Sequence, residues 1–159
     1  MSYKNYNFTF GKKSTSELKT CHKDIQLILN EAIKIIDISV LEGIRSDIRQ
    51  MSLYQEGKSH LDGITNKSKH QGKLDEYGNL VSYAVDIIPY IKGENPFDKT
   101  PKNLARFYYL MGIIDGIAHK LYNEGKIKHL VRFGLDWDGD HQFTDQNFDD
   151  LPHMELIEV

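Results

Sequence analysis

Apolar residues recur at helical spacing in three parts of the chain. The repeat over Leu18–Ile36 predicts a core helix. Ser46–Gly57 predicts a second helix, with the serine as its N-cap and the glycine as its stop. The longest helix is expected over Pro101–Gly125. Because its apolar residues lie all round, we expect it to be the central buried helix.

Other segments have the alternating or β-branched apolar pattern of strands. They are Asp37–Ile44, Leu80–Asp86, Lys128–Leu135 and His153–Val159. A hairpin is expected through Tyr77–Asn79, since its Gly-Asn pair tolerates a positive φ. Residues 91–101 are rich in glycine and proline and predict a loop. These elements predict an α+β fold, in which a small antiparallel sheet has helices packed on one side.

The length of 159 residues fits one domain with its own buried core. We therefore expect residues 1–159 to form a single domain, without internal repeats. Residues 1–13 are polar and aromatic and predict a loosely attached N-terminal arm. Ser14 or Ser16 would then cap the first helix.

Composition and charge narrow the class of protein. Apolar residues make up 40% of the chain and charged residues 27%, as in an ordinary globular protein. The net charge of -3 gives no electrostatic reason to expect a nucleic-acid partner. The single cysteine, Cys21, excludes an internal disulfide framework and fits a reducing cytoplasm. The first residues lack the apolar core of a signal peptide, and no run reaches transmembrane length, so no membrane insertion is expected.

Three residues have the chemistry of a catalytic zinc site. Such a site uses three protein ligands, drawn from histidine, carboxylate and cysteine, and leaves a fourth position open for water. His70, Asp86 and His153 fit that set, whereas Cys21 is remote in sequence. Asp150 lies three residues before His153 and is the candidate general base for the water.

The carboxylate ligand has two candidates, Asp75 and Asp86. Asp75 is nearer to His70 in sequence, but it lies in a charged turn that contains glycine. Asp86 ends an alternating strand pattern, and a strand supplies the rigid support that a metal ligand needs. We therefore prefer Asp86, which would place the zinc site at the sheet.

These segments also resemble a known family. SKHQ at 68–71, SYAVDIIPY at 82–90 and DLPH at 150–153 look like the SxH, AxD and [DE]xxH signature of the zinc D-Ala-D-Ala carboxypeptidase superfamily. VLEGIRSDIRQMSLYQEGKS at 40–59 resembles the GxRSxxxQxxLYxxGxS segment of its phage endolysin branch, the L-alanyl-D-glutamate peptidases. The resemblance runs from about Phe8 to the C-terminus. The first histidine and the aspartate are farther apart than in many members, and residues 73–81 look like an insertion.

The resemblance implies a function and a set of site residues. It implies zinc bound by His70, Asp86 and His153, a catalytic carboxylate at Asp150 and a substrate-contacting arginine at Arg45. The implied substrate is the stem peptide of bacterial peptidoglycan, cut between L-alanine and D-glutamate. An enzyme of this kind would be made in the host cytoplasm without a signal peptide and would act at the cell wall after release, as a monomer.

Two other functions stay open from the sequence. The same zinc constellation supports a D,D-carboxypeptidase, which releases only terminal D-alanine. A non-catalytic, zinc-containing module of a virion or of cell-wall binding is an alternative of another class. It would bind metal without turnover.

Several further residues have both a functional and a structural interpretation. Arg45 either stabilises negative charge at the scissile carbonyl or pairs with Asp47 or Glu42. Gln50 either reaches the cleft or is an exposed helix residue, and Trp137 either forms a cleft wall or covers the sheet. With Ser68, these two are the predicted substrate-binding residues.

The remaining histidines and acids are expected to be structural or solvated. His22, His119 and His129 have no carboxylate pattern around them in the sequence, and His60 lies in a turn. Glu155 is two residues from His153 on the same strand face, so it is a candidate to fix the imidazole tautomer. Residues 136–141 place acids at alternate positions but lack the glycine and glutamate of a calcium-binding EF-hand loop, so we expect solvated loop acids there, as at Asp149.

Overall fold

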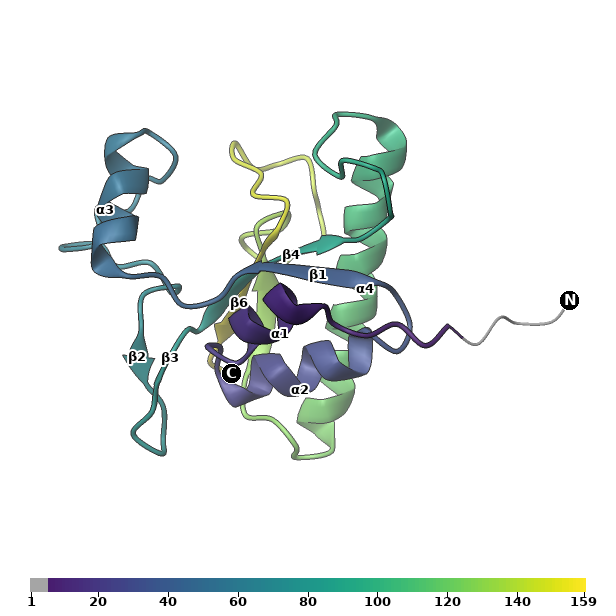
Figure 1. The fold of residues 1–159 in the computed structure, drawn as a ribbon, viewed down its shortest axis with the longest axis horizontal. Helices are drawn as coiled ribbons and strands as arrows, with labels where there is room; N and C mark the ends of the chain where they lie inside the picture. Colours follow the sequence, from purple (N-terminus) through teal and green to yellow (C-terminus); the bar gives the residue numbers. More distant parts are fainter. Residues whose placement is uncertain (1–5) are drawn as a thin grey trace, which may run out of the picture.

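Four strands form an antiparallel sheet in the order β1-β4-β6-β5 (Figure 1). The computed structural model describes residues 6–159. The strands span β1 Ile38–Glu42, β4 Ala84–Pro89, β5 Leu130–Phe133 and β6 His153–Ile157. Strands β1, β5 and β6 lie within predicted segments, whereas β4 overlaps only residues 84–86 of the segment predicted over residues 80–86 and extends beyond it. The α+β prediction with a small antiparallel sheet is confirmed.

Side-chain alternation gives this sheet two different faces. Val85 and Ile87 of β4, like Met154 and Leu156 of β6, are buried in the hydrophobic core. The intervening residues therefore point to the opposite face. That second face carries polar and charged side chains, which include Asp86, His153, Glu155 and Arg132.

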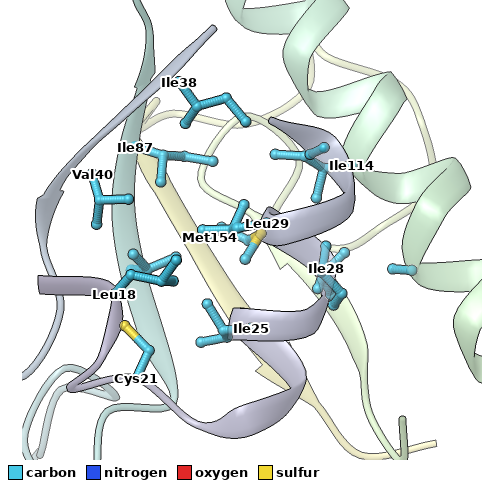
Figure 2. Close-up of a cluster of buried hydrophobic side chains, with 14 of the residues drawn as sticks. Leu18, Cys21, Ile25, Ile28, Leu29, Ile38, Val40, Ile87, Ile114 and Met154 are labelled. Carbon is cyan, nitrogen blue, oxygen red and sulfur yellow. The ribbon is translucent and has the colours of Figure 1, made fainter. Parts of the chain in front are cut away.

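Three helices cover the apolar face. They are α1 Lys12–Leu18, α2 Lys23–Ala32 and α4 Pro101–Asn123, and Figure 1 shows α1 and α2 lying across the sheet with α4 beside them. Ile25, Ile28 and Leu29 of α2 meet Ile114 of α4 and Met154 of the sheet in one cluster, drawn in Figure 2. The main hydrophobic core thus lies on one side of the sheet, and the polar residues of the other face stay free for chemistry.

The helix predicted over residues 18–36 is too long at both ends. Within that range only α2, Lys23–Ala32, is helical apart from Leu18, which ends α1, because residues 19–22 separate the two helices. Here the Ser82 nitrogen donates to Thr20 O (2.9 Å) and the His22 nitrogen donates to Ser82 O (2.8 Å), so the break pairs with the strand region. The His22 ring then caps α2 by accepting the Asp24 N–H (3.1 Å). Apolar spacing hides the break, since Leu18 and Ile25 are both buried.

The N-terminal region is more ordered than the arm expected over residues 1–13. Residues 1–5 lie outside the described part of the chain. Phe8 and Phe10 pack against the core, and α1 begins at Lys12 with Gly11 as its N-cap, ahead of Ser14 and Ser16. These contacts make Phe8 and Phe10 part of the packed structure.

Helix α4 differs from its prediction in burial but not in extent. Thr100 accepts the Asn103 N–H as N-cap, Pro101 takes the first turn, and Gly125 follows the helix with φ +68°. One stripe is buried, including Ile114 and Ala118, whereas Tyr109 is 63% exposed. The helix is therefore amphipathic rather than buried all round, and the prediction of a central buried helix is wrong.

Helix α3 and a small hairpin project to one side of the sheet (Figure 1). Helix α3 spans Asp47–Gln55, with Ser46 accepting the Arg49 N–H as its cap, as predicted. The hairpin joins β2 Lys73–Leu74 to β3 Leu80–Val81, and Gly78 has φ +82° in its turn. Within residues 6–159, no helix is both long enough and apolar enough to span a bilayer.

Candidate metal centre

His70, Asp86 and His153 converge on the polar face of the sheet. Strands β4 and β6 place Asp86 directly opposite His153. His70 comes from the loop before β2, and it is held where its carbonyl accepts the Arg45 N–H (2.8 Å). The three residues form a group with the composition and spacing to hold a metal ion.

The ligand atoms of this group form a nearly equilateral triangle. His70 Nε2 lies 3.1 Å from Asp86 Oδ1 and 3.3 Å from His153 Nδ1, and the third side, Asp86 Oδ1 to His153 Nδ1, is 3.4 Å. Ligands about 2.0–2.1 Å from a tetrahedral ion are separated by about 3.3 Å. The triangle therefore matches one face of a tetrahedral metal site, with the fourth corner open to the groove.

The outer nitrogen of each imidazole is held by a hydrogen-bond acceptor. His70 Nδ1 is 2.8 Å from the Gly43 carbonyl, and His153 Nε2 is 3.0 Å from Glu155 Oε2. Because both partners only accept, these nitrogens carry the protons of the neutral rings. The inner nitrogens, His70 Nε2 and His153 Nδ1, then direct their lone pairs at the centre of the triangle. This is the role expected for Glu155 from its place on the strand.

Protons compete for the same lone pairs when no cation is bound. Burial alone would lower the pKa of His153, but its hydrogen bonds to Asp86 and Glu155 raise that pKa to about 9. Burial alone would raise the pKa of Asp86, but hydrogen bonds from His153 and His70 hold it well below its usual range. The site thus favours a cation among its three ligand atoms.

Asp150 reaches this centre because Gly134 has no side chain. The Asp150 nitrogen donates to Gly134 O (2.9 Å), and a Cβ on Gly134 would lie 2.3 Å from Asp150 O. Burial and the nearby charge of Asp86 raise the pKa of the Asp150 carboxyl group. The residue lines a groove of about 580 Å³ together with His70, Asp86 and His153. A carboxylate with a raised pKa in this position is suited to proton transfer.

Arg45 lies beside the candidate ligand Asp86. Its side chain is 9% exposed and pairs with Glu42, while Nη2 lies 3.6 Å from Asp86 Oδ2. A β-bulge after Val40 brings Glu42 opposite Asp86 on the neighbouring strand, and this explains why Arg45 can contact both carboxylates. Of the two sequence interpretations, the ion pair with Glu42 is present, and the same arginine also lines the groove.

Comparisons with known proteins agree with this geometry. The family model for phage L-alanyl-D-glutamate peptidase matches residues 6–157. The chain belongs to that family. It is 26% identical over 156 residues to the L-alanyl-D-glutamate peptidase of Escherichia phage T5, covering 95% of this chain and 99% of the relative. It also has the fold of the Serratia marcescens L-Ala D-Glu endopeptidase ChiX, with a TM-score of 0.63, 21% identity, and coverage of 95% of this chain and 92% of that structure.

Gln50 and Ser68, two of the predicted substrate-binding residues, are both buried, and of the two only Ser68 lines the groove. Gln50 is fully buried, so the exposed alternative is wrong. Its Oε1 accepts from Arg45 Nη1 (2.9 Å), and its Nε2 donates to Ser59 Oγ (2.9 Å) and Leu61 O (2.7 Å). Ser68 is also buried, and its Oγ accepts the His70 N–H (3.2 Å). Gln50 positions Arg45, and Ser68 positions His70 at the edge of the groove.

Trp137 forms part of the groove wall. Its ring centre is 5.3 Å from that of His153, and its Nε1 donates to Phe148 O (2.9 Å). Asp75, the other candidate ligand, instead lies in the turn between β2 and β3, where it accepts the Tyr77 and Asn79 N–H groups. Of the two aspartates, Asp86 is therefore the one beside the histidines.

Sequence reasoning missed several groove residues. Arg132 and Lys69 both contact Glu155, behind His153. By contrast, Glu42 was one of the two partners expected for Arg45, and it does pair with that arginine. His60, expected to be a structural residue in a turn, packs edge-on against Phe148, and both residues line the groove.

The acids of residues 136–141 do come together. Carboxylate oxygens of Asp136, Asp138 and Asp140 lie within 4.8 Å of one another. Asp136 is buried and accepts the Gly139 and His141 N–H groups, whereas Asp138 and Asp140 are exposed. The hydrogen bonds of Asp136 order the loop beside Trp137. Asp149 is exposed and accepts from Gln146.

Proposed function

We propose that this chain is a zinc-dependent peptidase that hydrolyses the L-alanyl-D-glutamate bond of peptidoglycan stem peptides. The observation that carries the proposal is one groove lined by the ligand triangle of His70, Asp86 and His153, by Asp150 and by Arg45. Membership of the phage peptidase family supports the substrate. Two neutral imidazoles and one carboxylate are a ligand set that zinc accepts.

The groups around the triangle supply what amide hydrolysis needs. When bound, a zinc ion lowers the pKa of water toward about 7 and polarises carbonyl groups. Asp150 accepts the proton of the attacking water, because its raised pKa suits a base that must later act as an acid. It then returns that proton to the departing amine of D-glutamate. Glu155 and the Gly43 carbonyl keep both histidines in the required tautomers.

Arg45 stabilises the oxyanion that forms at the scissile carbonyl. A guanidinium has five N–H groups. Its contacts to Glu42, Gln50 and Asp86 use at most four of them, so at least one remains for substrate. The same contacts hold the side chain in place before substrate arrives. A donor fixed in advance needs no reorganisation when the charge develops.

The place of action follows from this substrate. The chain would act on the cell wall once released from the host cytoplasm, as a monomer whose own groove binds the stem peptide. It needs no membrane insertion to do so.

Mass spectrometry of digested peptidoglycan tests the proposal. Zinc-loaded wild type should release fragments with a new amino-terminal D-glutamate. Asp150→Asn should lower kcat about 10²–10⁴-fold, because it removes the proton-transfer group while leaving the ligand set intact. Asp149→Asn is the matched control, an exposed acid one residue away that should keep full activity.

The outcomes separate the alternatives. Release of D-alanine alone would replace the proposal by a D,D-carboxypeptidase. Zinc binding without any product would favour a non-catalytic module. Equal rates for wild type and Asp150→Asn would remove Asp150 from the mechanism.

A further inference from the structure

A second hollow, of about 690 Å³, adjoins the candidate catalytic groove. The two hollows share lining residues, namely Lys67, Ser68, Lys69 and Arg132. Ser68 and Lys69 immediately precede the candidate ligand His70. A substrate bound at the triangle can therefore extend past these residues into the second hollow without leaving the protein surface.

The second hollow is cationic although the chain is not. Lys67, Lys69, Lys73 and Arg132 line it, against the single acid Glu158, whereas the whole chain has a net charge of -3. Arg132 and Lys69 are already paired with Glu155. Among residues 6–159, no carboxylate oxygen lies within 4.0 Å of Lys67 or Lys73 Nζ. These two lysines carry the positive charge that is left for a ligand.

Apolar side chains form part of the remaining lining, which also includes Ser68, Gln71, Gly72 and His129. Tyr83, Leu156 and Ile157 line it between the cations. Lys73 Nζ lies 5.1 Å from the centre of the Tyr83 ring, which holds this lysine over the wall. A ligand with methylene groups and carboxylates would fit both parts of the lining.

The stem peptide has that chemistry on one side of the scissile bond only. From D-glutamate onward it carries the α-carboxylate of D-glutamate, the aliphatic side chain of a diamino acid and a terminal carboxylate. On the other side lie L-alanine and neutral N-acetylated sugar. We propose that the Lys67–Lys73 hollow binds the acidic part of the stem peptide that follows D-glutamate. This inference rests on the proposed function, and it sets the direction in which the substrate lies.

The test uses zinc-loaded protein and two soluble muropeptides. One carries the whole stem, and the other ends at D-glutamate diamide, which has no carboxylate on that side. Lys67→Gln/Lys73→Gln should lower kcat/KM for the whole stem about tenfold, since two exposed charge contacts are lost. It should lower kcat/KM for the diamide much less, because the diamide offers the two lysines no carboxylate to bind. Raising the salt concentration should shrink the wild-type preference for the whole stem.

Lys34→Gln/Lys126→Gln is the charge-matched control. Both residues are exposed lysines paired with Glu31 and Glu124, and they line neither hollow. This control should cleave the whole stem as wild type does, and the comparison holds even if the diamide is a poor substrate. Equal rates of whole-stem cleavage by the two double variants would overturn the proposed second subsite but would leave the proposed peptidase function standing. Failure of wild type to cut either muropeptide would instead overturn the proposed function.

Discussion

Residues 6–159 contain two His–Asp–His groups that look alike by composition and proximity. In each of them, His70/Asp86/His153 and His22/Asp24/His129, the potential ligand atoms lie within 4.8 Å of one another. Both are largely buried. They differ in whether the potential ligand atoms are already hydrogen-bonded within the group or keep their lone pairs for a cation. That difference decides which group suits a metal.

The first group directs its protons outward. Gly43 O and Glu155 accept from the outer nitrogens, so two lone pairs and a carboxylate face one point. With both rings neutral, the arrangement lacks a donor at its centre, and a bound cation supplies what is missing. Its position beside the groove also gives substrate access.

In the second group, the potential ligand atoms are already used in hydrogen bonds. His22 Nδ1 accepts the Asp24 N–H, which leaves the proton on Nε2, 3.3 Å from Glu76 Oε2. Asp24 Oδ2 accepts from His129 Nδ1 (2.7 Å) and from the Lys128 and His129 N–H groups. Every close contact joins a donor to an acceptor, so the group ties α2 to the segment that leads into β5. Proximity of metal-type residues is therefore a weaker criterion than the direction of their lone pairs.

Removal of one histidine from each group should separate their roles most strongly. His153→Ala should abolish hydrolysis and weaken zinc binding by more than the roughly 100-fold that loss of an outer-shell partner costs. His129→Ala should keep both activity and zinc affinity. Calorimetric zinc titrations and peptidoglycan assays check this. The distinction fails if His129→Ala loses zinc to the same degree.

Glu155→Gln should give the next largest effect. The amide can still accept from His153 Nε2 but lacks the charge that strengthens the imidazole as a ligand. Zinc affinity should fall about 10–100-fold. Competition with a chelator of known affinity measures it, and an unchanged affinity would show that Glu155 does not support the ligand.

Zinc affinity should also depend on pH with a definite sign. The pKa of His153 is raised to about 9 without metal, so below that pH the ring must lose a proton before it binds. Affinity should therefore rise about tenfold per pH unit between pH 6 and 8 and level off near pH 9. In Glu155→Gln the levelling should begin at lower pH, because one cause of the raised pKa is gone. A flat profile over pH 6–8 would contradict this account of the site.

Asp24→Asn should affect stability but leave the metal site unchanged. The Asp24 carboxylate is nearly buried and accepts three hydrogen bonds, so its neutralisation should lower the free energy of unfolding by about 1–3 kcal/mol. Zinc affinity should be unchanged, whereas the matched variant Asp86→Asn should lose it. Urea unfolding of the metal-free proteins, followed by zinc titration, measures both quantities.

Local patterns in the sequence predicted much of the fold. Ser46 before α3, Pro101 at the start of α4 and Gly78 in the hairpin turn are short-range signals, and each appears where expected. The break between α1 and α2 was not predictable in this way. It depends on Ser82, which pairs with residues 20–22 from a distant part of the chain.

In the candidate site, too, some features were predictable from the sequence and others depend on contacts between distant segments. The resemblance to the phage peptidases, together with residue types and spacing, singled out His70, Asp86, His153 and Asp150, and the fold brings them into one groove. The place of Gln50 behind Arg45 depends on hydrogen bonds to Ser59 and Leu61, which helical spacing cannot reveal. The close approach of Gly134 to Asp150 joins distant segments in the same way.

Anomalous diffraction from a zinc-soaked crystal tests the contrast between the two groups most directly. The account predicts a zinc peak about 2.0–2.2 Å from His70 Nε2, His153 Nδ1 and Asp86 Oδ1. It predicts no peak at His22, Asp24 and His129. Zinc at the second group, with none at the first, would contradict the central claim that lone-pair direction identifies the metal centre.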